Sequence, residues 1–219
     1  MAKLTVNDLD LRGKRVFTRV DYNVPMEGSG DAMVINDDTR IRATLPTLEA
    51  LRAQGARIVL AAHLGRPKGE RVASMSLRPV ADKLADLLGQ PVAFADDCVG
   101  ETAEAAINKL QEGELLLLEN VRYHSCEEAN GSDFAEQLAA NVDVFVNDAF
   151  GAAHRAHAST AGIAEVITAR GGQCVAGLLM ERELQFLGAE LETPDKPFVV
   201  ILGGAKVSDK INVIDRLIE

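Results

Sequence analysis

The sequence predicts an α/β protein built on a parallel β-sheet with helices on both faces. Short apolar runs recur along the chain, and helix-like segments separate them. The runs are apolar at successive positions, which is typical of strands covered on both faces; strands with one solvent face alternate. This rhythm of strand and helix favours a parallel, Rossmann-like sheet.

Six runs are predicted to be strands, and four further segments to be helices. The strands are RVFTRV (15–20), RIVLAAH (57–63), PVAFA (91–95), ELLLLEN (114–120), VDVFVND (142–148) and FVVILGG (198–204). The helices are 39–55, which ends in Gly55; 76–91, closed by Gly89 and Pro91; the amphipathic segment from Gly177, stopped by Pro194 and Pro197; and 207–219. The segment AEVITARGGQCVAG (164–177) is interpreted as a loop or helix extension without a function.

These elements predict a division into three parts. Residues 1–176 form one α/β lobe, 177–194 an interdomain helix, and 195–219 the first βα unit of a second, truncated α/β lobe. A single βα unit cannot cover both faces of its strand. We therefore expect 195–219 to be poorly anchored and the chain to be the front portion of something longer.

Composition excludes several classes of function. The formal net charge is −10, which argues against nucleic acid and anionic membranes as partners. No apolar stretch reaches the roughly 20 residues that span a bilayer, and no signal peptide is evident, so we expect a cytoplasmic protein. Cys98, Cys126 and Cys174 lack CxxC spacing, which predicts ordinary thiols, no disulfide and no metal site.

The residues after the apolar runs predict a basic edge. Ligands bind beyond the carboxyl ends of parallel strands, and four predicted strands, together with the start of the first helix, bring polar or cationic groups there. These residues are Asp21, Asn23, Arg40, His63, Arg66, Arg122, His154 and Arg155. Arginines suit carboxylate or phosphate, and Asp21 and Asn23 suit a hydroxyl. The expected ligand is small, strongly anionic and hydroxylated.

The remaining sequence motifs give weaker evidence of function. ILGGAKVSDK (201–210) places Gly203, Gly204, Lys206 and Lys210 after a strand, where backbone N–H groups and lysines could approach phosphates, but it matches neither GxxxxGK[ST] nor GxGxxG. A tight turn before a solvated helix explains it equally well. His157, Arg42 and the acidic pairs Asp96–Asp97 and Glu127–Glu128 are interpreted as ordinary surface groups. No GxSxG or HExxH motif supports a hydrolase.

Seven motifs in order resemble the phosphoglycerate kinase family over the whole chain. They are RVDYNVP, DDTRIRATLPTL, HLGRPKG, LLLLENVRYH, FVNDAFGAAHRAHAST, GLLMERELQFL and ILGGAKVSDKI. The resemblance implies a two-lobed, hinge-bending, monomeric enzyme of glycolysis that moves a phosphoryl group between 1,3-bisphosphoglycerate and ADP, giving 3-phosphoglycerate and ATP.

The resemblance also implies residue roles. Asp21, Asn23, Arg40, His63, Arg66, Arg122 and Arg155 would bind the glycerate substrate; Arg40 and Lys206 would stabilise the transferring phosphoryl group. Gly203, Gly204, Lys206 and Lys210 would contact ATP or ADP. Mg²⁺ and most nucleotide ligands are expected in a second lobe that this sequence lacks, so we expect the chain alone to be inactive.

Two other functions stay open on the sequence alone. The chain could be a free-standing module that binds 3-phosphoglycerate without turnover, or a non-catalytic interaction protein. Titration with 3-phosphoglycerate separates these two, and a coupled kinase assay separates both from an enzyme.

Overall fold

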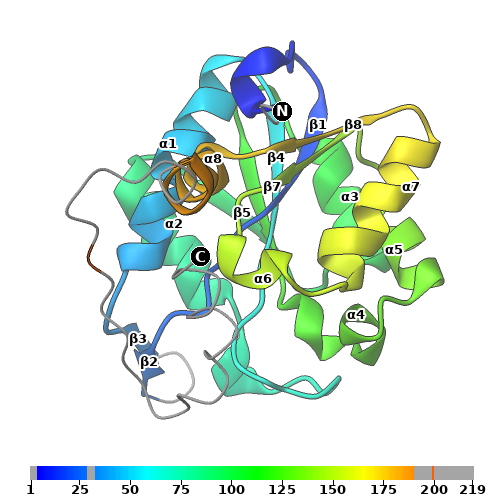
Figure 1. The fold of residues 1–219 in the computed structure, drawn as a ribbon. Helices are drawn as coiled ribbons and strands as arrows, with labels where there is room; N and C mark the ends of the chain where they lie inside the picture. Colours follow the sequence, from blue (N-terminus) through cyan, green and yellow to red (C-terminus); the bar gives the residue numbers. More distant parts are fainter. Residues whose placement is uncertain (1–3, 29–32, 190–198, 200–219) are drawn as a thin grey trace. The chain divides into compact units, whose positions relative to one another are not determined.

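The computed structural model describes residues 4–28, 33–189 and 199. The chain divides into two units, residues 1–181 and 182–219, and the sheet and the apolar cores described below belong to the first. Its centre is a six-stranded sheet with the order β5-β6-β4-β1-β7-β8, in which every pair of neighbours is parallel (Figure 1). The predicted α/β class with a parallel sheet is confirmed.

The strands and helices have the following bounds. The strands are β1 Arg15–Arg19, β2 Met26–Glu27, β3 Val34–Ile35, β4 Arg57–Ala61, β5 Val92–Ala95, β6 Leu115–Leu118, β7 Val144–Asn147 and β8 Gln173–Ala176. The α-helices are α1 Thr39–Ala53, α2 Arg78–Leu88, α3 Gly100–Lys109, α4 Ser125–Glu128, α5 Ser132–Ala139, α6 Phe150–Ala153, α7 Ile163–Ala169 and α8 Leu178–Leu184. Short 3-10 helices are η1 Val6–Asp8, η3 Ala73–Met75 and η4 Val121–Tyr123, and π-helical turns are η5 Ala158–Gly162 and η6 Gln185–Ala189.

Two apolar cores lie on opposite faces of the sheet. Neighbouring residues of one strand point to opposite faces, so Val16 of β1 joins one core and Phe17 joins the other. The Val16 core contains residues of α1 and α2, and the Phe17 core contains residues of α3, α5 and α7. Figure 1 shows these two groups of helices on opposite sides of the strands. This double cover explains why the strands are apolar at successive positions.

Five of the six predicted strands are confirmed as β1, β4, β5, β6 and β7, and the two first predicted helices as α1 and α2. The sixth strand (198–204) and the helix at 207–219 lie outside the described residues. The division at 176 and the interdomain role of 177–194 stay predictions.

The interpretation of 164–177 as a loop or helix extension was incomplete. This segment forms most of α7 and the edge strand β8, which pairs with β7. Gln173 at its start is exposed, and its four residues are only partly apolar, so β8 lacks the composition of a strand buried on both faces. The hairpin β2–β3 was also missed, since each strand has two residues.

None of the helices that the structure describes is long and apolar enough to cross a bilayer.

Candidate functional site: a basic edge at the ends of the central strands

The predicted basic edge follows from the strand order. β6, β4, β1 and β7 are consecutive neighbours in the sheet, and all four run in the same direction. Their carboxyl ends therefore meet at one edge. Asp21 and Asn23 follow β1, His63 and Arg66 follow β4, Arg122 follows β6, and Arg155 follows β7 by way of α6.

The innermost pair of this edge is Arg19 and His63. Arg19 is the last residue of β1 and is fully buried, and His63 is 8% exposed. Nη2 of Arg19 lies 3.1 Å from Nδ1 of His63. A guanidinium has donors and no acceptor, so Nδ1 must accept this hydrogen bond, and the hydrogen of the neutral imidazole is then on Nε2. His63 can thus donate an N–H group to an anion.

Nearby cations contribute to the low pKa of His63. Burial lowers this pKa first, followed by the charges of Arg19, Arg122, Arg155 and Arg40, to about 2. Three of these arginines were predicted from sequence to share one site. Arg40, Arg122 and Arg155 are therefore near enough to His63 for their charges to act on its imidazole.

Gly65 joins two of the predicted site residues through its backbone. Its N–H donates to Oδ1 of Asn23 at 2.9 Å, and its carbonyl accepts from Nη1 of Arg122 at 3.0 Å. Gly65 has φ +65°, and an added Cβ would lie 2.8 Å from Sδ of Met75. Glycine therefore suits this position, and the loop after β4 holds Asn23 and Arg122 in register.

Asp21 and Arg40 form a second pair. Nη1 of Arg40 lies 2.8 Å from Oδ2 of Asp21, and Oδ1 of Asp21 accepts from the backbone N–H of Asn23 at 3.2 Å. The carboxylate keeps further lone pairs and the guanidinium keeps further donors. The pair can therefore present an acceptor and a donor to the same ligand.

Arg66 and Arg155 are exposed, whereas Arg122 is 5% exposed. Burial lowers the pKa of Arg122 below its ordinary value; Glu128 and Glu127 raise it, and the charges of Arg155 and Arg66 lower it further. Arg66 and Arg155 are thus close enough to Arg122 for their charges to oppose that of Arg122. Bringing like charges together costs free energy, and a bound anion would reduce that cost.

Glu127 was wrongly interpreted as a surface charge. Its side chain is fully buried, and Oε1 accepts from the Ser159 hydroxyl at 2.6 Å. The same hydroxyl accepts from Nε of Arg19 at 2.9 Å. Glu127 faces inward toward a buried arginine and a half-buried histidine: Nδ1 of His157 lies 3.3 Å from its Oε2, and Nε of Arg122 lies 3.9 Å from the same oxygen. His157, interpreted as a surface residue, is therefore a half-buried partner of Glu127.

Arg19 and Asn120, two buried polar residues beneath the basic edge, were not predicted from the sequence. Arg19 is a charged residue inside an apolar strand run. It could have been recognised from the sequence, because a buried arginine needs partners. Asn120 is fully buried: its Nδ2 donates to the carbonyls of Leu64 and Met75, and its Oδ1 accepts from the N–H groups of Leu64 and Arg122. It ties the loop after β4 to the start of η4.

Four predicted residues, Gly203, Gly204, Lys206 and Lys210, lie outside the described residues. Their predicted contacts with a nucleotide stay predictions.

The fold and the edge together define a class of protein: a parallel α/β protein with cationic groups gathered at the carboxyl ends of its central strands. The profile of the family described as "Phosphoglycerate kinase" matches residues 6–219. The chain belongs to the phosphoglycerate kinase family.

Individual relatives agree with this assignment. The phosphoglycerate kinase of Desulforudis audaxviator is 56% identical over 219 residues, which are 100% of this chain and 54% of the relative. That of Rippkaea orientalis is 53% identical over 216 residues, which are 99% of this chain and 52% of the relative. The chain thus spans about half the length of the curated relatives it matches.

Solved structures give the same result. The phosphoglycerate kinase of Coxiella burnetii matches with a TM-score of 0.82 and 38% identity. The match covers 97% of this chain and 51% of the Coxiella burnetii chain. The phosphoglycerate kinase of Pyrococcus horikoshii OT3 matches with a TM-score of 0.84 and 34% identity. The match covers 98% of this chain and 52% of the Pyrococcus horikoshii chain.

Proposed function

We propose that this chain provides the 3-phosphoglycerate-binding lobe of a phosphoglycerate kinase. The observation that carries the proposal is the geometry of the edge, where Arg19 lies 3.1 Å from Nδ1 of His63 and Arg122 donates to the Gly65 carbonyl at 3.0 Å. Burial, followed by the charges of Arg19, Arg122, Arg155 and Arg40, lowers the pKa of His63. An edge that holds a neutral imidazole among so many cations is suited to a ligand with more than one negative group. 3-Phosphoglycerate has a phosphate, a carboxylate and a hydroxyl.

The roles of the side chains follow from their chemistry. Arg66, Arg122, Arg155 and His63 bind the anionic ends of the substrate, because a guanidinium can donate two parallel hydrogen bonds to a phosphate or carboxylate. Asp21 accepts from the substrate hydroxyl. Asn23 uses its carbonyl oxygen on Gly65, so its NH₂ group is the part that we expect to donate to the ligand.

Arg40 stabilises the charge of the transferring phosphoryl group in this proposal. Phosphoryl transfer depends mainly on alignment and on neutralising charge on the equatorial oxygens, and an ionised carboxylate acceptor needs no general base. Asp21 restrains Arg40 at 2.8 Å, which reduces the freedom that its guanidinium would lose on binding.

The nucleotide, Mg²⁺ and closure of two lobes belong to the same proposal. The residues of this chain predicted to meet ATP or ADP, Lys206 among them, lie outside the described residues, so no step is derived through the nucleotide. Monomeric state and a cytoplasmic location likewise stay predictions.

Calorimetric titration with 3-phosphoglycerate tests the proposal. Arg122 and Arg155 each contribute charged hydrogen bonds, so replacing either by Ala should weaken binding by about 1.5–3 kcal/mol. Arg42→Ala is a matched control on α1, because Arg42 is exposed and pairs with Asp38 at 2.8 Å. It should bind within about 0.5 kcal/mol of the unchanged chain.

Unchanged affinity in Arg155→Ala would contradict the proposed site. A coupled kinase assay with ATP and 3-phosphoglycerate then addresses turnover separately. Binding without turnover would favour the module that binds 3-phosphoglycerate, whereas the absence of binding would overturn the proposed function itself.

A further inference from the structure

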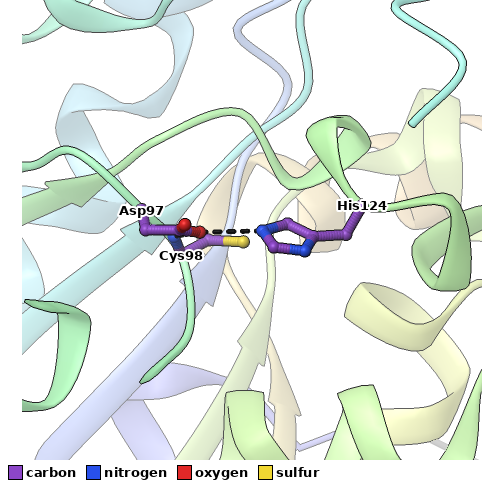
Figure 2. A group of neighbouring side chains, drawn as sticks. All are labelled: Asp97, Cys98 and His124. Atoms are coloured by element: carbon purple, nitrogen blue, oxygen red, sulfur yellow. Dashed lines mark hydrogen bonds and ion pairs between the residues drawn. The ribbon is translucent and has the colours of Figure 1, made fainter. Parts of the chain in front are cut away.

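Three potential metal ligands lie together outside the residues assigned to the basic edge. Asp97 and Cys98 come from the loop between β5 and α3, and His124 comes from the junction of η4 and α4. One donor atom from each lies within 4.8 Å of the others. Figure 2 shows the Asp97 carboxylate and the Cys98 sulfur both directed toward the same side of the His124 ring. His124 lies 27 residues after Asp97 in the sequence, which explains why ligand spacing predicted no metal site.

The donor set favours a particular kind of cation. A thiolate, an imidazole and a carboxylate are ligands of Zn²⁺, whereas Mg²⁺ and Ca²⁺ prefer oxygen ligands alone. Two anionic ligands and one neutral imidazole would balance the charge of a divalent cation.

The separation of the nitrogen and oxygen donors is close to that which such an ion requires. Nε2 of His124 lies 2.7 Å from Oδ1 of Asp97. Bonds of about 2.0–2.1 Å in a tetrahedral site put neighbouring N and O ligands about 3.3 Å apart. A modest rotation of two half-exposed side chains, which are 30% and 32% exposed, supplies this difference. Cys98 is 2% exposed, so its sulfur would close the inner side of the site.

The surroundings prepare the carboxylate to act as a ligand. The backbone N–H of Cys98 donates to Oδ1 of Asp97 at 2.7 Å. Nη2 of Arg71 lies 3.1 Å from Oδ2 of Asp97, while Oδ1 faces His124. Ligating carboxylates are commonly oriented by such an outer hydrogen bond.

We propose that Asp97, Cys98 and His124 form a binding site for a divalent cation of the Zn²⁺ class, with three protein ligands and one position for water. Binding converts the Cys98 thiol to a thiolate and releases its proton to solvent. The ring hydrogen of neutral His124 moves from Nε2 to Nδ1, so that Nε2 is available to the metal. Because the thiol must lose its proton to bind the metal, affinity should increase as pH rises.

Co²⁺ is the probe, because a cobalt–thiolate bond has a charge-transfer band in the near ultraviolet and tetrahedral Co²⁺ absorbs in the visible. The full chain, without a histidine tag, is titrated with CoCl₂ and then with ZnCl₂. We expect one equivalent of Co²⁺ to give the thiolate band and Zn²⁺ to remove it. Loss of an outer partner of a metal ligand costs about 10–100-fold in affinity, so Cys98→Ser should cost at least as much.

The other two cysteines provide matched controls, since Cys126 is exposed and Cys174 half-buried. The variant with both Cys126→Ser and Cys174→Ser should keep the band and the stoichiometry. His124→Gln should weaken binding as Cys98→Ser does, and far-ultraviolet circular dichroism checks that each variant is folded. Absence of the band in the unchanged chain, or its persistence in Cys98→Ser, would overturn the proposal.

Discussion

Nη2 of Arg19 lies 3.1 Å from Nδ1 of His63, with both side chains buried beneath the basic edge. The guanidinium fixes the imidazole as an acceptor at Nδ1 and opposes its protonation. Burial lowers the pKa of Arg19 to about 10, so Arg19 keeps its charge at neutral pH. The histidine is therefore a permanently neutral donor among cations.

The first prediction is that His63 does not titrate between pH 5 and 8. Its pKa is about 2 in the folded chain, because burial and four arginines disfavour the imidazolium. The ring resonances of His63 should keep constant chemical shifts over this range in NMR spectra assigned with His63→Gln. A midpoint near 6.5 would show that Arg19 is not its partner.

The second prediction concerns stability in acid. The unfolded chain binds a proton at His63 below about pH 6.5, and the folded chain does not, so the unfolded state gains protons as pH falls. The contribution of His63 is fully present above pH 6.5 and declines below it, by at most about 1.4 kcal/mol per pH unit. Urea unfolding at pH 7 and pH 5.5 measures this loss, and in His63→Gln the loss should be smaller by about 1 kcal/mol.

Much of the fold could be predicted because strands buried on both faces have an unmistakable composition. Leu115–Leu118, apolar throughout, is an example, and Gln173–Ala176 is the counterexample at the sheet edge. The strand ends similarly predicted that Asp21, His63 and Arg122 share an edge. Sequence could not predict that Glu127 is buried and Glu128 is not, because this depends on which carboxylate of α4 meets Ser159 and His157 in the folded chain.

The third prediction is that Asn120→Ala lowers the free energy of unfolding by about 2–4 kcal/mol. The change leaves buried backbone groups of Leu64, Met75 and Arg122 without their hydrogen bonds, and each unsatisfied group costs about 1–3 kcal/mol. Urea unfolding measures the loss. Asn147→Ala is the control: Asn147 ends β7, and among the described residues its side chain accepts one hydrogen bond, from the N–H of Ala149, so the cost should be about 1 kcal/mol. Equal costs in the two variants would contradict the proposed support role.

The fourth prediction is that Gly177→Ala destabilises the fold because the added methyl group meets Asp148. An added Cβ at Gly177 would overlap the buried carboxyl group of Asp148, whose Oδ1 accepts from the N–H groups of Leu179 and Met180 at 3.0 and 3.1 Å. Gly177→Ala should therefore cost about 2–4 kcal/mol, measured by urea unfolding. Gly171→Ala is the control: Gly171 has φ +77° and nothing lies within 4 Å of an added Cβ, so backbone strain alone should cost about 1 kcal/mol.

A double variant separates overlap from other causes. Asp148→Ala removes the carboxyl group, so Gly177→Ala should cost clearly less in that background than in the unchanged chain. Additive costs would show that the two residues do not meet.

The last prediction is that Asp21 recognises the hydroxyl of 3-phosphoglycerate. Asp21 is held between Arg40 and the N–H of Asn23, so its carboxylate is already oriented, and a hydrogen bond to a charged acceptor is worth about 1.5–3 kcal/mol. The deoxy analogue 3-phosphopropionate keeps both anionic ends and should bind more weakly than 3-phosphoglycerate by that amount in calorimetry. Asp21→Ala should remove the difference between the two ligands, whereas Asp21→Asn, which keeps an acceptor oxygen, should retain part of it. Because Arg40 loses its charged partner in both variants, a change that affects the two ligands equally reports only on Arg40. Equal binding of 3-phosphopropionate and 3-phosphoglycerate by the unchanged chain would exclude the role of Asp21, even if Arg122 and Arg155 prove to bind the phosphate.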